Sequence, residues 1–367
     1  MYEEGLAKID ETGAFLNPYS RFSRDISVAV LSMACTDAAR VLDATAATGI
    51  RGIRYFKELG FRDITFLDIN KECSESIKRN TESNMVSGDG IKVYNLSIQE
   101  FANTSKDRFD VIDLDPFGGP VPDIADLMRL VRDGGLFMVS ATDTAVLCGA
   151  QPNACIRNYG SLPLHDELCH ESSIRILIGY VARVAAQYNF GIEPIYSVVH
   201  MHFVRVILRL RKGASNADRS LKEMGFAYHC KRCGWISYSK GLFPTLDNCD
   251  ICGKSVNKGG IMWMGRMYDK EVKEYVYDYF KRMEYEGLNA VAMIRSELDE
   301  FPFYYNIPTL TRIMHMAAVS PYDVICRLND SGFKASMTHM ERESIRSDAG
   351  INDVKRCIET AMGRVRD

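Results

Sequence analysis

The first 141 residues alternate short apolar segments with helical patterns, and this alternation constrains the fold more than any other feature of the chain. Five segments have the composition of buried strands: 40–44, 63–68, 90–96, 109–114 and 135–141. Apolar strands separated by helices predict an α/β fold with a mostly parallel sheet that helices cover on both faces. Ligands in such sheets bind beyond the carboxyl ends of the strands. The residues that follow each strand are therefore the first candidates for a functional site.

The length of the chain, 367 residues, favours two domains. Two further apolar segments, 195–199 and 202–210, have the pattern of an antiparallel strand pair that closes the sheet. The pattern breaks after them, around 211–220. We therefore expect a sheet domain over 1–215 and a smaller α+β domain over 216–367.

The charge is distributed unevenly along the chain. The net charge is −3, but residues 201–267 hold 12 Lys and Arg against 4 Asp and Glu. One basic region on an otherwise acidic protein suits contact with a polyanion such as a nucleic acid. The alternative is a solvated surface that is basic by chance.

Secretion and membrane signals are missing from the sequence. No run of 18 apolar residues occurs, and Met1–Glu4 begin an acidic segment without an apolar signal core. The 11 cysteines are then expected in a reducing compartment. We expect a cytoplasmic protein without a membrane span, and we find no sign of an obligate protein partner.

The segment after the first strand, 43–52, has the small residues and glycines that let a backbone approach a ligand closely. It is neither the Gly-x-Gly-x-x-Gly of a dinucleotide site nor a phosphate-binding loop. Asp68 ends the next strand, where a carboxylate can accept hydrogen bonds from ribose hydroxyls. An adenosine site without a pyrophosphate loop favours S-adenosylmethionine (SAM). The segment resembles the first motif of class I SAM-dependent methyltransferases.

The strand 109–114 runs into Asp115, Pro116 and Phe117. An acid, a proline and an aromatic ring at a strand end suit a flat base with an exocyclic amine. The carboxylate accepts a hydrogen bond from the amine, the proline fixes the turn and the ring stacks on the base. Asp113 precedes Asp115 by two residues and faces the same side of the sheet. We expect Asp113 to contact the cofactor, orient Asp115 or raise its pKa.

Four cysteines in the second half predict a zinc ribbon within 226–265. Their spacing is Cys230-x2-Cys233-x15-Cys249-x2-Cys252. Four thiolates close the coordination sphere of Zn²⁺, so the expected site is structural.

Three other cysteines, Cys148, Cys155 and Cys169, have no ligand spacing, and we interpret them as small buried residues. The histidines His165, His170 and His200 are scattered, and we expect structural roles for them.

Blocks along nearly the whole chain resemble the tRNA guanine-N2 dimethyltransferase family. They comprise 15–18, 23–25, 47–54, 113–118, 141–144, 147–150, 167–171, 175–177, 302–306 and 332–339. The resemblance implies transfer of two methyl groups, from two SAM molecules, to the exocyclic N2 amine of a tRNA guanosine, usually position 26. The base leaves its stack to reach such a pocket. The resemblance also implies a C-terminal domain that binds tRNA.

The resemblance assigns roles to particular residues. Asp115 is the main catalytic residue, assisted by Asp113. Phe117, Phe15 and Pro116 bind the base. The residues implied for the cofactor are Arg24, Asp43, Thr48, Gly49, Arg51, Asp68, Ser97, Ile98 and Asp113.

The positions of Ser97 and Ile98 depart from the family pattern, which has Asp-Ala after the third strand. Ser97 retains one hydrogen-bond acceptor and Ile98 can pack on the adenine. Two other functions stay open. One is a methyltransferase for another amine, adenine N6 or a protein glutamine, and the other is an inactive zinc-ribbon protein that binds RNA.

Overall fold

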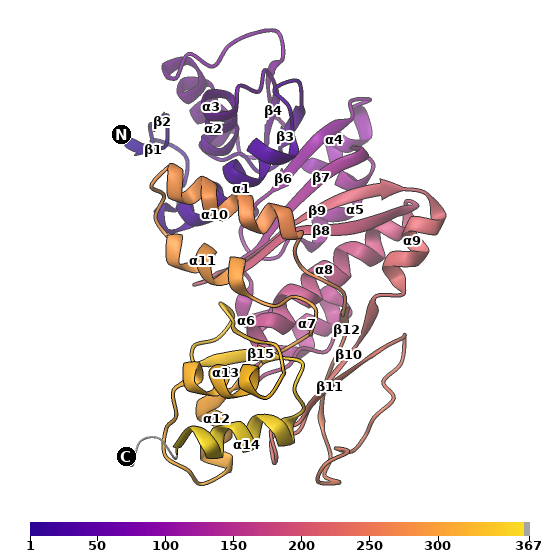
Figure 1. Ribbon diagram of the computed structural model, residues 1–367. Helices are drawn as coiled ribbons and strands as arrows, with labels where there is room; N and C mark the ends of the chain where they lie inside the picture. The colour runs from indigo at the N-terminus through magenta and orange to yellow at the C-terminus, as the bar shows by residue number, and fades with distance from the viewer. Residues whose placement is uncertain (363–367) are drawn as a thin grey trace.

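The computed structural model describes residues 1–362, and its largest element is a seven-stranded sheet (Figure 1). The strand order is β5-β4-β3-β6-β7-β9-β8. The first five strands run parallel, and β9 and β8 close the sheet as an antiparallel pair. The bounds are β3 (Arg40–Asp43), β4 (Asp63–Asp68), β5 (Ile91–Asn95), β6 (Phe109–Leu114), β7 (Val131–Ala141), β8 (Phe190–His200) and β9 (Phe203–Lys212). The predicted α/β class and the closing pair are confirmed.

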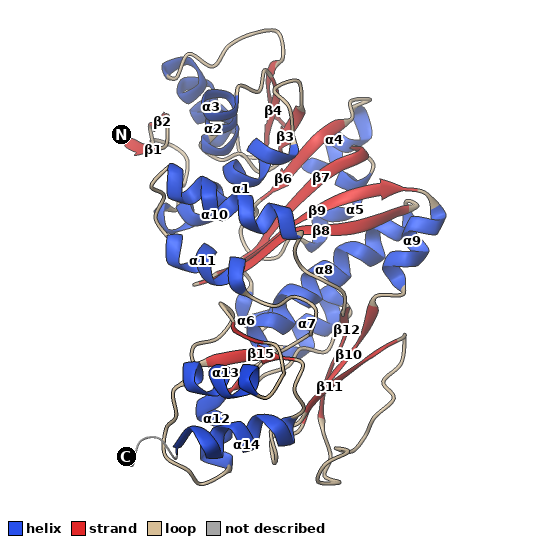
Figure 2. Ribbon diagram, viewed as in Figure 1, coloured by secondary structure: helices blue, strands red, loops and turns tan. Residues whose placement is uncertain are grey.

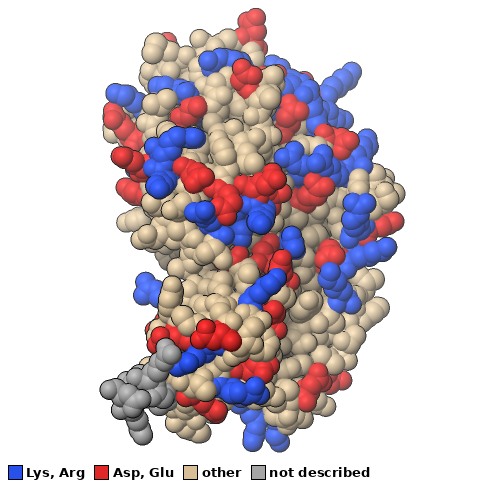
Figure 3. All heavy atoms as spheres, viewed as in Figure 1, with Lys and Arg blue, Asp and Glu red and all other residues tan. Residues whose placement is uncertain are grey.

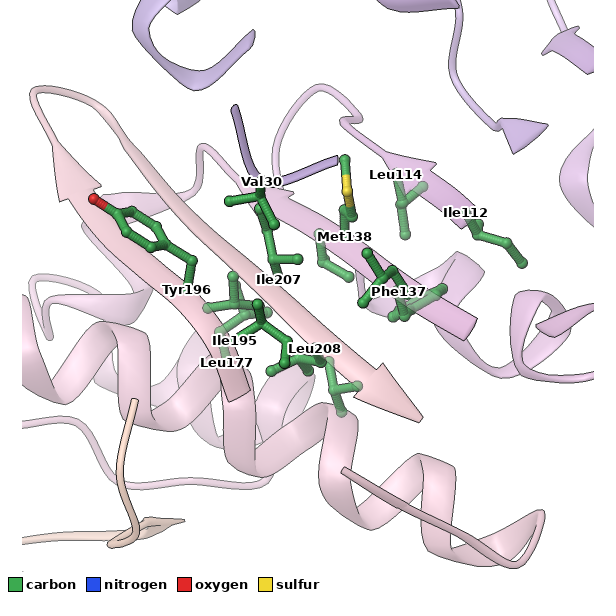
Figure 4. Packing of buried hydrophobic residues seen from close by; sticks show 14 of the residues in the cluster. Val30, Ile112, Leu114, Phe137, Met138, Leu177, Ile195, Tyr196, Ile207 and Leu208 are labelled. Carbon is green, nitrogen blue, oxygen red and sulfur yellow. The ribbon is translucent and has the colours of Figure 1, made fainter. Parts of the chain in front are cut away.

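Helices cover both faces of this sheet (Figure 2). They include α1 (Arg21–Ala34), α2 (Ile50–Leu59), α3 (Lys71–Ser83), α4 (Ile98–Thr104), α5 (Val121–Met128) and α8 (Cys169–Gln187). Two short helices, α6 (Thr144–Leu147) and α7 (Pro152–Tyr159), pack on α8. A short hairpin of β1 (Tyr2–Glu4) and β2 (Ala7–Ile9) and the 3-10 turn η1 (Pro18–Ser20) precede them. Val30 of α1 and Leu177 of α8 pack on the side chains of β7, β8 and β9 (Figure 4). Burial of these apolar side chains stabilises the layers.

Two local sequence patterns differ from the structure. Residues 123–131 have a helical pattern in the sequence, but α5 ends at Met128, and Val131 begins β7 and pairs with Phe109 of β6. The break expected at 211–220 holds a helix, α9 (Ala214–Leu221), which packs against β8. Its Ser220 hydroxyl accepts a hydrogen bond of 2.8 Å from the Ile192 amide. A short amphipathic helix between polar residues is difficult to distinguish from a linker by pattern alone.

The second half of the chain begins with an antiparallel ribbon of three strands in the order β11-β10-β12. Their bounds are β10 (Met224–His229), β11 (Ile236–Lys240) and β12 (Asn257–Trp263). The chain then returns to the large sheet, where α10 (Lys270–Arg282) packs on α1 and α11 (Leu288–Ser296) packs on α10. Thus α10 belongs to the core of the sheet domain although it follows the division expected at residue 215.

The last segment forms a second apolar cluster with the ribbon. It contains β13 (Tyr305–Asn306), α12 (Ile307–Ile313), α13 (Pro321–Asp330), β14 (Ala335–Met337), β15 (Ser344–Ser347) and α14 (Ile351–Met362). None of the helices in the described part of the chain has the length and apolar character needed to cross a membrane.

A fully buried charge network connects the two halves. Arg346 of β15 lies 2.9 Å from Glu171 of α8 and 2.6 Å from Glu297, which follows α11. Burial alone would raise the pKa of Glu297, but the charges of Arg346 and His339 hold it well below its usual range. Buried ions are tolerated only when they are paired in this way.

Replacing Arg346 with alanine is expected to lower the free energy of unfolding by about 3–5 kcal/mol, because it leaves two carboxylates buried without their partner. Urea denaturation of both proteins measures this difference. Arg342→Ala, at an exposed position four residues earlier, is the matched control and should change stability by less than about 0.5 kcal/mol. Equal effects of the two substitutions would show that the buried network does not stabilise the junction.

Candidate active site

The polar residues predicted at strand ends do converge at one edge of the sheet. The parallel register of β3 and β6 places Asp43 directly beside Asp113. Asp68 ends β4 on the other side of β3. Asp115 follows β6, and its amide donates a 3.0 Å hydrogen bond to the Thr45 hydroxyl. The carboxyl edge therefore carries four carboxylates on three neighbouring strands.

The loop between β3 and α2 is held open by backbone geometry and by Asp68. Ala47 and Gly49 adopt left-handed conformations with φ of 48° and 80°. One oxygen of Asp68 accepts the Ala47 amide at 2.9 Å, and the other accepts the Asn70 amide at 2.8 Å. A carboxylate has about four acceptor positions, so Asp68 retains capacity for ribose hydroxyls. Thr48 is a buried residue of this loop.

Asp43 lies beneath the loop and is 1% exposed. Its carboxylate accepts the Gly52 amide at 3.2 Å. Burial raises the pKa of Asp43 to about 7, and the neighbouring charge of Asp113 acts in the same direction. Asp43 therefore holds the first turn of α2 in place through this hydrogen bond.

Arg51 joins the two aspartates of the β6 end. Its Nε donates to Asp115 at 3.1 Å, Nη2 also binds that carboxylate, and Nη1 lies 3.5 Å from Asp113. Burial would raise the pKa of Asp115, but Arg51 and then Arg205 outweigh it and lower the pKa to about 2. A raised pKa of Asp115 was one of three alternative roles expected for Asp113, and the net shift is downward because the arginines dominate. Asp115 is an ionised carboxylate whose side chain is 25% exposed.

Asp113 has no exposed surface. It accepts the Tyr55 hydroxyl at 2.5 Å and Nη2 of Arg205 at 2.8 Å. Arg205 also donates to the Ser140 hydroxyl of β7 at 2.9 Å. Sequence reasoning missed both Tyr55 and Arg205. Arg205 could have been found from the sequence, because an arginine within an apolar strand is buried and therefore requires a charged or polar partner.

The two predicted aromatic residues lie together at the surface. Phe117 is 77% exposed and Phe15 is 58% exposed. Their ring centroids are 5.1 Å apart with an angle of 56° between the planes. This is the separation of one aromatic contact, so a base that enters between them must separate the rings. Gly118 and Thr142 exchange hydrogen bonds of 2.8 and 2.9 Å, which tie the Phe117 turn to the end of β7.

Arg24 is engaged elsewhere in the structure. It is buried in α1, and its Nε and Nη2 bind both oxygens of Glu4 at 2.7 and 2.5 Å. Burial would raise the pKa of Glu4, but Arg24 and Arg54 lower it to about 2. The pair joins the N-terminal hairpin to α1.

Ser97 and Ile98 lie at the start of α4. The Ser97 hydroxyl accepts the Glu100 amide at 3.1 Å and the Glu100 carboxylate accepts the Ser97 amide at 2.9 Å, which is a capping box. The hydroxyl also donates to this carboxylate at 2.7 Å. One lone pair of this hydroxyl remains for a ligand. Ile98 is buried.

The four ribbon cysteines form one cluster. Each of their sulfur atoms lies within 4.8 Å of the others. The pairs Cys230–Cys252 and Cys233–Cys249 are each 3.5 Å apart. Zn–S bonds of about 2.3 Å in a tetrahedron place sulfur atoms about 3.8 Å apart. The donor set and its geometry therefore fit a structural Zn²⁺ ion.

Comparisons with known proteins identify the family of the chain. The family model of N2,N2-dimethylguanosine tRNA methyltransferases matches residues 4–359. The chain belongs to this family. It is 34% identical to a protein of Methanothermobacter thermautotrophicus over 95% of this chain and 93% of the relative. It is 35% identical to one of Thermococcus kodakarensis over 95% of each. Both relatives are named tRNA (guanine(26)-N(2))-dimethyltransferase.

A solved structure supports the same assignment. Trm1 from Pyrococcus horikoshii in complex with S-adenosyl-L-methionine has a TM-score of 0.88 and 30% identity. The match covers 97% of this chain and 99% of that one. The family and the methyltransferase fold predicted from the sequence are confirmed. The roles of individual residues stay predictions.

The raised pKa of Asp43 predicts a pH-dependent stability difference. The folded state holds this proton up to about pH 7, whereas the unfolded chain loses it near pH 4, so Asp43 lowers stability as the pH rises between these values. Asn at this position carries no such penalty and can still accept the Gly52 amide. The difference in free energy of unfolding, Asp43→Asn minus native, should therefore increase by about 2–3 kcal/mol when the pH rises from 5 to 7.

Urea denaturation at the two pH values measures this change. Asp89→Asn, at an exposed loop position, is the control and should show no such dependence. A pH-independent difference for Asp43→Asn would mean that Asp43 is ionised throughout this range.

Proposed function

We propose that the protein transfers methyl groups from SAM to the exocyclic N2 amine of a guanosine in tRNA, at position 26, with a dimethylated product. The observation that carries the proposal is Asp115, a partly exposed carboxylate that buried Arg51 holds and that Pro116 separates from exposed Phe117. The tRNA partner and the cofactor are those of the family to which the chain belongs.

The carboxyl edge supports a SAM site. Gly49 and Ala47 allow close approach of the loop backbone, and Asp68 retains acceptor positions for ribose. Ile98 and the free lone pair of Ser97 are assigned to the adenine. Arg51 is assigned to the carboxylate of the amino acid moiety. When bound, the cofactor supplies an electrophilic methyl group.

Asp115 is assigned to the guanine amine. The lone pair of this amine is delocalised into the ring, so the amine is a weak nucleophile. A hydrogen bond from N–H to the Asp115 carboxylate orients the amine and localises its lone pair. With a pKa of about 2, Asp115 is a weak base. It would accept the proton once the methyl group has left the sulfonium sulfur for the amine nitrogen, because the resulting ammonium cation is strongly acidic.

Arg51 is assigned contacts with both the cofactor and the catalytic carboxylate of Asp115. Its guanidinium neutralises Asp115 and is itself shielded from solvent. A cofactor carboxylate on Arg51 would share that positive charge and make Asp115 a better acceptor. Asp113, held by Tyr55 and Arg205, is a positioning residue for Arg51.

The tRNA would reach this edge with the target base outside its stack. Phe117 and Phe15 present apolar rings to solvent, which a flipped base would cover. At the opposite edge of the sheet, exposed basic residues suited to phosphates surround α9, and they are Arg211, Lys212, Arg219 and Lys222. On the face in Figure 3, Lys and Arg side chains gather along this margin. We assign tRNA binding chiefly to residues 216–367 and the protein to the cytoplasm.

The function is tested by incubating bulk tRNA with labelled SAM and analysing the nucleosides of the digest. Label in N2,N2-dimethylguanosine is the expected result. Label only in adenosine, or in protein glutamine with none in tRNA, would favour the other amine substrates. Bound SAM with no transfer to any of them would favour the inactive RNA-binding protein.

Asp115→Asn should lower kcat for methyl transfer by at least about 10²-fold, because its amide is a poor acceptor for the amine proton. The Kd values for SAM and tRNA should change only a few-fold. Asp110→Asn is the matched control, since Asp110 lies near the opposite end of the same strand and binds Arg132. A parallel loss of SAM affinity would contradict the catalytic role.

Phe117→Ala should weaken capture of the flipped base. In tRNA with 2-aminopurine at position 26, binding of the native protein should raise the fluorescence, because the base leaves its stack. Phe117→Ala should reduce this signal and lower kcat/KM about tenfold or more, since one base stack contributes about 1–3 kcal/mol. Phe117→Tyr keeps the ring and should retain both. Loss in both variants alike would exclude stacking as the role of this residue.

A further inference from the structure

We propose that Cys148, Cys169 and His170 form a second zinc site, separate from the ribbon, beside the substrate side of the active site. One ligand atom from each of the three residues lies within 4.8 Å of the other two. Spacing in the sequence conceals this group, since 20 residues separate the two cysteines. The fold joins them because α6 packs against α8.

The place of these residues in the fold makes them accessible. Cys148 directly follows α6, and Cys169 and His170 are the first residues of α8. All three are half-buried, so neither cysteine is the buried packing residue expected from the sequence. Cys155 of α7, in contrast, has no exposed surface and lies outside the group. Half-burial permits a metal ion to enter and still excludes much of the solvent.

The hydrogen bond of His170 prepares its ring for a metal. Nδ1 lies 2.8 Å from the carbonyl oxygen of Met340. A carbonyl only accepts, so in the neutral ring Nδ1 carries the proton and Nε2 keeps its lone pair. Histidines that bind metals usually donate their second N–H to a carbonyl or carboxylate in this manner. The Glu341 carboxylate, 3.4 Å from Nδ1, favours the same tautomer.

The two thiols come from different segments, and each must lose its proton to bind a metal. Zn²⁺ would displace one proton from each thiol and bind both sulfurs, with release of the protons to solvent.

The donor set selects the metal. Two sulfurs and one imidazole suit Zn²⁺ among the common divalent ions. Zn–S and Zn–N bonds place tetrahedral ligands about 3.5–3.8 Å apart, so ligand atoms that now lie within 4.8 Å of one another would have to move closer together to bind the ion. Three protein ligands leave one position for water, unlike the closed ribbon site.

A metal ion at this site would stabilise the segment that supports the Phe117 turn. Cys148 lies six residues after Thr142, which is hydrogen-bonded to Gly118 in the Phe117 turn. His170 reaches the C-terminal segment through Met340. Zn²⁺ would thus join α6, α8 and, through His170, the segment around 340. This proposal does not depend on the identity of the methylated substrate.

The test is the zinc content of the full-length chain after saturation with Zn²⁺ under reducing conditions and removal of excess metal. The native protein should hold two Zn²⁺ per chain. Cys169→Ser and Cys230→Ser should each hold one, because each removes a ligand of a different site. Cys155→Ser, a buried cysteine of the same region, is the control and should hold two. One Zn²⁺ in the native protein, with no change in Cys169→Ser, would overturn the proposal.

A second measurement needs no substitution. The native protein is alkylated with iodoacetamide with and without Zn²⁺, and the modified cysteines are located by mass spectrometry. Zn²⁺ should slow alkylation of Cys148 and Cys169 at least tenfold and leave exposed Cys326 unaffected. Equal rates at Cys148 and Cys169 in the two samples would exclude the site even if a variant failed to fold.

Discussion

The parallel pairing of β3 with β6 is the constraint on which the active site depends. It places Asp43 beside Asp113, and two carboxylates in an apolar sheet edge repel each other unless cations or protons compensate them. Arg51 and Arg205 supply the positive charge from α2 and β9, and the raised pKa of Asp43 lets it keep its proton. The same arginines hold Asp115 ionised at the surface. The charge balance of the core thus determines the state of the residue assigned to catalysis.

The second charge network has an analogous role in the C-terminal half. Glu171, Glu297 and Arg346 come from three distant parts of the chain, and all three are fully buried. Arg175 adds hydrogen bonds of 3.0 Å to the carbonyls of Trp263 and Gly265, where the ribbon ends. Paired buried ions contribute little net stability compared with apolar packing, but wrong partners leave them uncompensated. We therefore assign this network to the orientation of the C-terminal half on the sheet domain.

Much of the site could be read from local patterns. Asp68 and Asp115 were found because both follow apolar strands, and the ribbon cysteines because metal knuckles have fixed spacing. Residues that act through distant partners were missed. Tyr55 is one of many helix residues, and only the fold brings it to Asp113. Cys148 and Cys169 were interpreted as packing residues because their closeness depends on how α6 meets α8.

The sequence by itself determined the α/β class, the carboxyl edge as the place of the site, the family and the zinc ribbon. The family follows from the resemblance of sequence blocks, and the other three follow from periodicity, strand-end chemistry and ligand spacing, which are properties of local stretches of the chain. Only the tertiary structure decided the partners of Arg24, the ionisation of Asp43 and Asp115, and the return of α10 to the sheet domain. Each of these depends on burial and on charges contributed by segments far apart in the chain, which no local pattern contains.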